Sequence, residues 1–175
     1  RPSWRNANGA SQTFASNAAA LTGPPGGTYT LTDAAADYGM VPNGETRACL
    51  DCFGVSVSSP ATRPVMHWDA TLEERITPDA QGQDKLWAVH VGNSFTDVPA
   101  SSPFYRFVET LLHRGVTAGC TPTTYCPVSS TTREQMAVFV LASNEGSGYM
   151  PPACGTPAFA DVPAGSPFCR WVEEL

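Results

Sequence analysis

The sequence contains very little lysine and few charged residues of either sign. Lys85 is the single lysine among 175 residues, charged side chains make up 15% of the chain, and 16 acidic residues against 10 basic ones give a net charge of −6. Proteins that bind nucleic acid or anionic lipid need clustered lysine and arginine to neutralise phosphates. The composition therefore argues against both kinds of partner.

Long apolar runs and catalytic signatures are also missing. No segment approaches the roughly 18 consecutive apolar residues of a membrane span, and neither a "GxSxG" nor an "HExxH" motif occurs. We therefore predict no membrane insertion, no enzymatic activity, no catalytic residues, no cofactor and no metal. In "MHWDAT", His67 and Asp69 would share one face of a strand, and we interpret this group as structural, with Trp68 in the core.

Six cysteines fall into three close pairs. The pairs are Cys49 with Cys52, Cys120 with Cys126, and Cys154 with Cys169. Short separations and an even count favour three local disulfides. "CLDC" could instead be a redox or zinc pair, but the strand-like "FGVSVS" comes after it where a redox pair would open a helix, and no second close ligand pair suits zinc. Structural disulfides in turn predict an oxidising, extracellular setting.

Residues 1 to about 94 alternate apolar and polar positions in short runs. Such runs include "TYTLTD", "FGVSVS", "VMHWDATLEER" and "KLWAVHV", and they are separated by "GPPGG", "VPNGET", "SSPATRP" and "TPDAQGQ". A period of two buries one face of a strand, and the Gly, Pro, Asn and Asp clusters supply turns. The Ala-rich stretch Asn17 to Leu21 lacks a helix cap, so we expect a strand there. The pattern predicts an antiparallel β-sandwich.

From Phe95 the period becomes helical. Ser102 as N-cap and Pro103 at the first helical position predict a helix start, and Gly115 predicts its end. The expected apolar stripe comprises Phe104, Phe107, Val108, Leu111 and Leu112. A second helix in "TTREQMAVFVLAS" would start at a capping box, Thr131 with Glu134 or Thr132 with Gln135, and bury Met136, Phe139 and Val140.

One phrase occurs twice in this helical part. "FTDVPASSPFYRFVETL" begins at Phe95, "FADVPAGSPFCRWVEEL" begins at Phe159, and 12 of the 17 aligned positions are identical. Asp97 and Asp161 occupy the same position of the two copies, ahead of a helix. We interpret these carboxylates as turn or cap acceptors rather than cation ligands.

The second copy stops at Leu175, within its first helix. Trp171, Val172 and Leu175 would then lie on an apolar face for which we expect no partner helix. The chain also begins at Arg1, without a methionine or a signal segment. We therefore expect further sequence outside both ends.

The region from Phe95 to about Ala142 resembles the S-layer homology motif, the repeated helix–loop–helix module of bacterial surface proteins. Its landmarks are "FTDVP", an aromatic helix, "RGVTAG", "YCP" and "TREQMAVFVL", in that order. The opening "WRNANGASQTFASNAAALTG" and "YGMVPNGETRAC" resemble immunoglobulin-like β-sandwich modules of bacterial secreted proteins. The departures are "TREQ" where the motif has "TRAE", and Cys120 and Cys126 in place of an Asp-Gly turn.

The resemblance implies binding of envelope polysaccharide, often pyruvylated, in grooves between motifs. In the family the arginine of the Thr-Arg helix start contributes to the groove, which here implies Arg133, with Thr132 and Glu134 beside it. An arginine in the first turn can present its planar fork to a carboxylate, and exposed N–H groups there also favour anions. These three residues are the expected polysaccharide site.

The expected architecture is therefore multidomain β plus α. Residues 1–94 would form the immunoglobulin-like β-sandwich, 95–145 the first repeat, 146–158 a linker and 159–175 the start of a second repeat. We expect a non-enzymatic, extracellular cell-surface protein that anchors to envelope polysaccharide, with the β-sandwich as a spacer. The alternative is a structural subunit of a filament or surface layer, in which self-association completes the unfinished repeat from a neighbouring chain.

Overall fold

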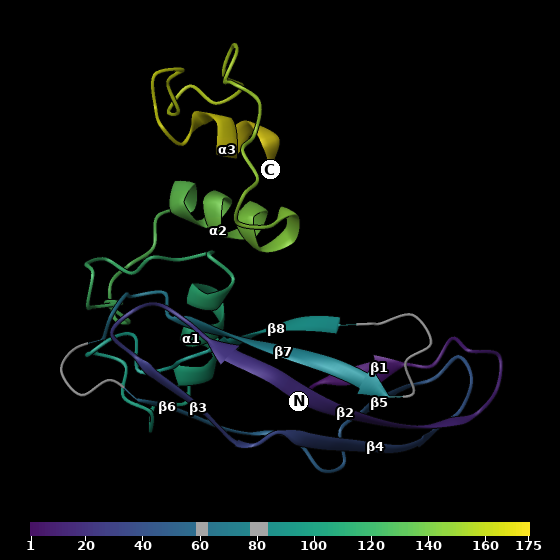
Figure 1. Ribbon diagram of the computed structural model, residues 1–175. Coiled ribbons are helices and arrows are strands. Elements are labelled where there is room, and N and C mark those ends of the chain that lie inside the picture. The colour runs from purple at the N-terminus through teal and green to yellow at the C-terminus, as the bar shows by residue number, and fades with distance from the viewer. Residues whose placement is uncertain (59–62, 78–83) are drawn as a thin grey trace. The chain divides into compact units, whose positions relative to one another are not determined.

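The computed structural model describes residues 1–58, 63–77 and 84–175. The chain divides into two compact units, Arg1–Val91 and Gly92–Leu175, which we describe separately (Figure 1). The turns predicted in "SSPATRP" and "TPDAQGQ" fall largely on residues 59–62 and 78–83, outside the described residues. None of the helices in the described part of the chain is long and apolar enough to cross a membrane.

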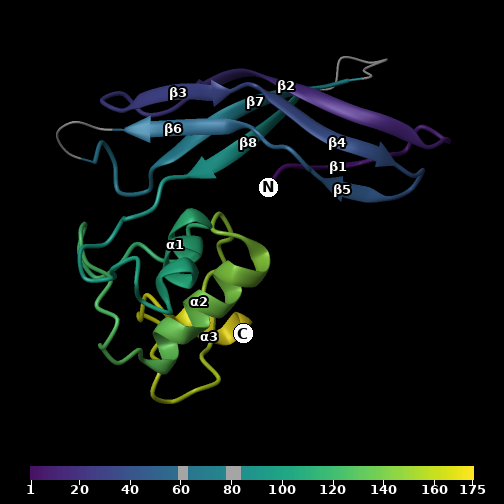
Figure 2. The same cartoon turned by 90° about the horizontal axis from the view of Figure 1, so that it is seen from below.

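The first unit is built from antiparallel strands. They are β1 (Ser3–Arg5), β2 (Gln12–Thr22), β3 (Thr28–Asp33), β4 (Ala35–Val41), β5 (Thr46–Ala48), β6 (Gly54–Ser58), β7 (Asp69–Thr77) and β8 (Asp84–His90). One sheet has the order β4-β2-β7-β8, and the pairs β1-β5 and β3-β6 form two smaller sheets (Figure 2). Strand β3 pairs with β6, and β4, which begins after Ala34, pairs with β2. One continuous stretch therefore links two sheets.

Most of the alternating runs are strands, as predicted. "TYTLTD" is β3, "FGVSVS" contains β6, "KLWAVHV" contains all of β8 except its first residue, Asp84, and the Ala-rich stretch lies inside β2. Strand β7 begins only at Asp69, later than the alternation indicates. Residues 63–68 form a bend instead, in which Trp68 donates its backbone N–H to the Met66 carbonyl at 3.1 Å.

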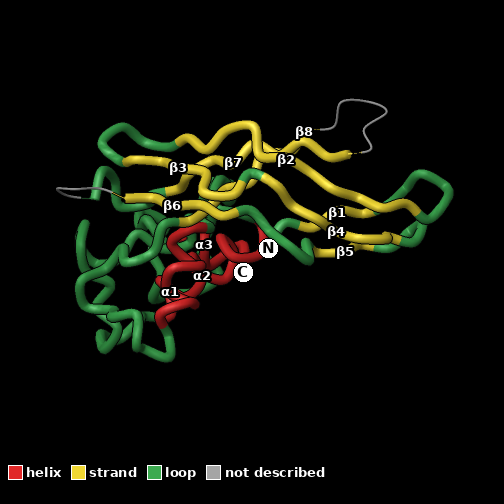
Figure 3. The backbone as a smooth tube through the Cα atoms, turned by 60° about the horizontal axis from the view of Figure 1, so that its bottom comes forward, coloured by secondary structure: helices red, strands yellow, loops and turns green. Residues whose placement is uncertain are grey.

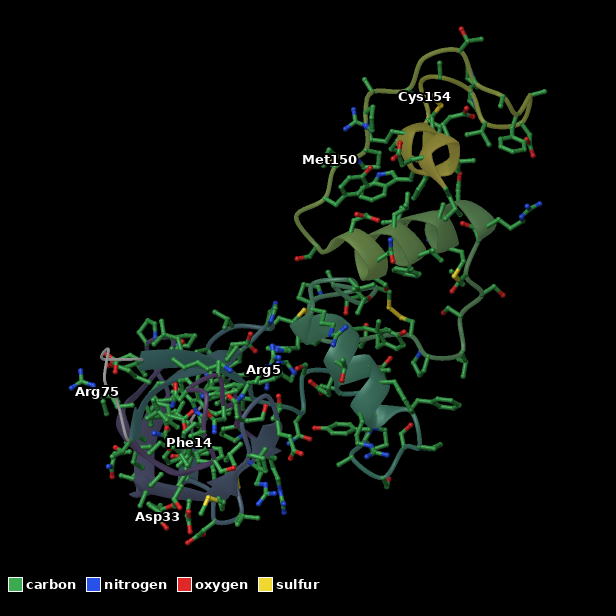
Figure 4. All side chains as sticks on the ribbon, turned by 90° about the vertical axis from the view of Figure 1, so that its right-hand side faces the viewer. Arg5, Phe14, Asp33, Arg75, Met150 and Cys154 are labelled. Carbon is green, nitrogen blue, oxygen red and sulfur yellow. A yellow bond between two sulfur atoms is a disulfide. The ribbon has the colours of Figure 1, made fainter. Side chains whose placement is uncertain are left out.

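The core of this unit lies between the four-stranded sheet and the segment around the first disulfide. Its buried members are Phe14, Ala36, Tyr38, Val41, Cys49 and Ile76. Figure 4 shows Phe14 among the densely packed side chains of this unit, while Arg75 points away from them. The Cys49–Cys52 disulfide closes the turn beside this core, as predicted. The arrangement is compatible with a β-sandwich, and the immunoglobulin-like assignment stays a prediction.

The side chain of Glu74 is buried in the interior of this unit, a feature that the sequence did not indicate. Glu74 is 0% exposed. Its Oε1 accepts hydrogen bonds from the Ser16 hydroxyl at 2.5 Å and from the Tyr38 hydroxyl, and its Oε2 accepts from the Trp87 indole N–H. Burial first, and then the hydrogen bond to this carboxylate, raises the pKa of Tyr38. Glu74 therefore joins β2, β4, β7 and β8 through side chains.

The second unit contains helices α1 (Tyr105–His113), α2 (Arg133–Glu145) and α3 (Cys169–Glu174), joined by long loops (Figure 3). Helix α1 starts two residues after the predicted start, and Phe104, with no side-chain cap, is its N-cap. Ser102 and Pro103 lie in the preceding turn, where the Ser102 carbonyl accepts from the Tyr105 N–H at 3.1 Å. Val108 and Leu112 are buried, whereas Phe104 and Phe107 are exposed, so the predicted apolar stripe is wider than the face that packs. Gly115, with φ +68°, lies just beyond the end of this helix.

Helix α2 begins at the predicted capping box, in the Thr132–Gln135 version. Its predicted buried face is wrong: Ala137, Leu141 and Ala142 are buried, while Met136 and Val140 are 47% and 44% exposed. The packed face therefore lies one position along the helix from Met136 and Val140. Helix α3 packs against α2, while Leu175 at its end is 64% exposed, so the expected apolar face of the second copy is covered only in part.

The two copies of the repeated phrase make the same internal contact. In the first copy the Ser94 N–H donates to Oε1 of Glu109 at 2.8 Å, and in the second the Ala158 N–H donates to Oε1 of Glu173 at 3.0 Å. Both donors immediately precede the first phenylalanine of their copy, and both acceptors lie at the same position of the helix. The predicted disulfides Cys120–Cys126 and Cys154–Cys169 are also formed.

Asp97 holds the loop between the two helices of the first copy. Its two carboxylate oxygens accept from the Tyr125 and Cys126 backbone N–H groups, both at 2.8 Å. Cys126 has φ +62°, a left-handed conformation that few non-glycine residues adopt. The predicted role of Asp97 as a turn acceptor is thus fulfilled across the loop and not at its own helix. The Tyr125 hydrogen bond is the main cause that lowers the pKa of Asp97.

We expect Asp97→Asn to lower the melting temperature, because an amide can accept only one of these two bonds. Because the pKa of Asp97 is lowered in the folded protein, its carboxylate stabilises the fold fully at pH values above the ordinary aspartate pKa. This contribution is lost as the pH falls through the lowered pKa. Thermal melts should therefore show a gap between wild type and variant at neutral pH that narrows in acid. Asp161→Asn, at the equivalent position of the second copy, is the control and should have less effect; equal effects would contradict the assignment.

Candidate functional site

A groove of about 560 Å³ lies in the second unit, between the start of α2 and the second copy of the repeat. Its lining residues are Thr132, Arg133, Glu134, Met136 and Ala137 from α2, and Phe159, Asp161, Val162, Val172 and Leu175 from the second copy. The three residues predicted for ligand binding therefore lie together on one wall. The groove is open to solvent and mixes apolar side chains with three charged ones.

The capping box fixes the first turn of α2, where Arg133 is the first residue. The Thr132 hydroxyl oxygen accepts from the Gln135 N–H at 3.3 Å, and the Gln135 side chain accepts from the Thr132 N–H at 2.9 Å. These two bonds satisfy amide groups that the end of a helix otherwise leaves unpaired. The departure from the family pattern, glutamine where glutamate is expected, thus keeps the reciprocal cap with a neutral side chain.

Arg133 itself is exposed at the rim of the groove. Among the residues that the structure describes, no carboxylate lies within 4.0 Å of its guanidinium. Its five N–H donors are therefore available to an anion, and the N-terminal end of the helix adds a favourable dipole. Glu134, half-buried, is the next residue of the first turn and lines the same wall.

The opposite wall comes from the second copy and was missed by sequence reasoning. Phe159 is 53% exposed there, whereas its counterpart Phe95 is 3% exposed. Phe95 lies against the Tyr125 ring, with 5.5 Å between ring centroids, and Asp97 is occupied by the loop's N–H groups. In the second copy the matching residues Phe159 and Asp161 instead face the groove. The alignment of the two copies was the signal that could have identified them.

This combination of side chains suits a sugar ligand that carries an acidic group. A guanidinium fork pairs with a carboxylate in a bidentate geometry. Ionised carboxylates such as Glu134 and Asp161 accept hydrogen bonds from hydroxyl groups. The apolar surface of Met136, Phe159 and Val172 can cover the C–H face of a sugar ring, because binding sites combine apolar and aromatic surface with a few polar groups that fix orientation.

Comparison with known proteins identifies the family of this region. Residues 94–137 match the S-layer homology domain. The matched segment contains the first copy of the repeat, α1 and the first turn of α2 with Arg133. Domains of this family are non-catalytic modules that attach proteins to the cell surface by binding envelope polysaccharide. No curated protein and no solved structure gives a significant match to the chain.

Proposed function

We propose that this protein anchors to an acidic envelope polysaccharide through the groove between α2 and the second copy of the repeat. The observation that carries this proposal is Arg133, which lies exposed at the rim of that groove with no ion-pair partner among the described residues. The family of the matched segment supports a cell-surface ligand of this class. The location of the protein is then extracellular, at the cell surface.

Each wall of the groove has a separate role in this proposal. Arg133 pairs with the carboxylate of a pyruvyl or similar acidic substituent, while Glu134 and Asp161 accept hydrogen bonds from sugar hydroxyls. Thr132 uses its hydroxyl oxygen in the helix cap, so it mainly positions Arg133, and its O–H hydrogen can still be donated to the ligand. The β-rich first unit acts as a spacer, with the divisions 1–94, 95–145, 146–158 and 159–175 as proposed domain bounds.

The direct test varies the ligand. The purified protein is mixed with isolated envelope polysaccharide, either intact or treated with mild acid to remove ketal-linked acidic groups, and centrifuged. We expect the protein to pellet with intact polysaccharide, to remain in the supernatant without it, and to lose most binding after the treatment. Equal pelleting with both polysaccharide samples would contradict recognition of an acidic group by Arg133.

A second candidate function is self-association into a filament or surface layer. The exposure of Phe159, whose counterpart Phe95 is covered by its own loop, favours it. A loop from a neighbouring chain that covered Phe159 as Tyr125 covers Phe95 would fill the groove and exclude polysaccharide. In the same experiment, pelleting without any polysaccharide would favour assembly over anchoring.

A further inference from the structure

We propose that His67, Asp69 and His90 form a binding site for a divalent transition metal ion in the first unit, with zinc as the expected ion. The site lies where β7 begins and β8 ends, outside the S-layer homology segment. It is independent of the proposed polysaccharide groove. From the sequence we predict no metal and interpret His67 and Asp69 as structural; His90 lies 21 positions beyond Asp69 in the chain.

The register of the β7–β8 pair creates the cluster. Asp69 and His90 lie directly opposite each other on the two antiparallel strands. His67 lies in the bend just before β7, and its Nε2 contacts Asp69 there, while Trp68 between them is buried with 4% exposure. Cross-strand partners such as Asp69 and His90 are about 5 Å apart at Cβ. Two imidazoles therefore flank one carboxylate.

The donor atoms converge as a metal site requires. Nε2 of His67 lies 3.1 Å from Oδ2 of Asp69, and Nδ1 of His90 lies 2.9 Å from Oδ1. One donor atom from each residue falls within a span of 4.8 Å. Tetrahedral zinc with bonds of about 2.1 Å separates its ligand atoms by roughly 3.4 Å, so the observed spacing needs only a small expansion.

The backbone that carries these ligands is held in place before any metal binds. Trp68 donates from its indole N–H to the Tyr29 hydroxyl at 2.9 Å, and its carbonyl accepts from the Val91 N–H at 2.9 Å. Arg63 donates from Nε to the Met66 carbonyl at 3.0 Å and stacks 5.5 Å from the Trp68 ring. These contacts fix the chain on both sides of His67 and beside His90. Ligand side chains that are already held in place lose less conformational entropy when the metal ion binds.

The donor set selects the ion. Imidazole nitrogens bind zinc, copper and nickel well, whereas calcium and magnesium require mostly oxygen ligands. The ring nitrogens that contact Asp69, Nε2 of His67 and Nδ1 of His90, are also the atoms that would coordinate the metal ion. The ion would therefore take the place of the hydrogen in each of these hydrogen bonds. Two histidines and one carboxylate supply three ligands and leave one coordination position for water or another donor. The side chains of His67, Asp69 and His90 are 42%, 28% and 14% exposed, so an ion can reach them.

The test is a calorimetric titration of the full chain with Zn²⁺, repeated for His67→Ala, Asp69→Asn and His90→Ala. We expect saturable binding of one equivalent in the wild type and at least about a tenfold loss of affinity in each variant. Co²⁺ should give a visible absorption band in the wild type that is weakened in the variants. Excess Ca²⁺ should not displace zinc.

Two controls separate ligation from general charge and folding effects. Glu73→Gln removes one negative charge from the same strand and should bind Zn²⁺ like the wild type. Melting temperatures without metal show whether each variant is folded, and the half-exposed His67 is the substitution least able to disturb the sheet. Unchanged affinity in the folded variants, or no saturable binding of Zn²⁺ stronger than about 1 mM, would overturn the proposal.

Discussion

Replacing Glu74 by alanine is expected to destabilise the first unit by about 3–5 kcal/mol, from unsatisfied donors and lost packing. The carboxylate is fully buried and accepts hydrogen bonds from Ser16, Tyr38 and Trp87. Alanine leaves these three donors without their acceptor and removes most of a buried side chain, and each unsatisfied donor that is buried, as those of Ser16 and Tyr38 are, costs about 1–3 kcal/mol. Small domains have only about 5–15 kcal/mol of stability, so the variant should be close to unfolded at 37 °C.

Urea denaturation followed by tryptophan fluorescence measures this effect, because Trp4, Trp68 and Trp87 all belong to the first unit. Glu73→Ala is the matched control, since it removes the same side chain from the adjacent, partly exposed position of β7. The control should shift the midpoint little. Similar shifts of the urea midpoint for Glu74→Ala and Glu73→Ala would contradict a stabilising role of the hydrogen bonds to Glu74.

Sequence reasoning succeeded where the signal is local. The capping box at Thr132 needs only residues three apart, and each predicted disulfide joins cysteines close in the chain. The strand β3 is evident directly from alternation. Such features depend on the conformation of a few consecutive residues, so tertiary packing has little opportunity to change them.

Features that depend on register or on close packing were not predictable. The pairing of Asp69 with His90 depends on how β7 and β8 align, and the alternation within each strand leaves that alignment open. The burial of Glu74 has the same origin, because alternation alone does not show which face of β7 meets Tyr38 and Trp87. The packed face of α2 was misassigned because Ala137, Leu141 and Ala142 are its buried residues, and not Met136 and Val140.

Arg133→Ala is expected to weaken polysaccharide binding by about tenfold to a hundredfold. A hydrogen bond to a charged group contributes roughly 1.5–3 kcal/mol, and each 1.4 kcal/mol corresponds to tenfold in affinity. The guanidinium is exposed and makes no ion pair among the described residues, so its removal should leave folding unchanged. Arg133→Lys keeps the charge but loses the planar fork, and its affinity should fall between those of the wild type and the alanine variant.

Isothermal titration of wild type, Arg133→Ala and Arg106→Ala with purified acidic envelope polysaccharide tests the anchoring groove most directly. Arg106 is an exposed arginine of α1 in the same unit that does not line the groove, so its loss changes the net charge equally. A large loss of affinity confined to Arg133→Ala is the predicted result. Equal affinity of all three proteins, or equal losses in both variants, would contradict a site at the start of α2.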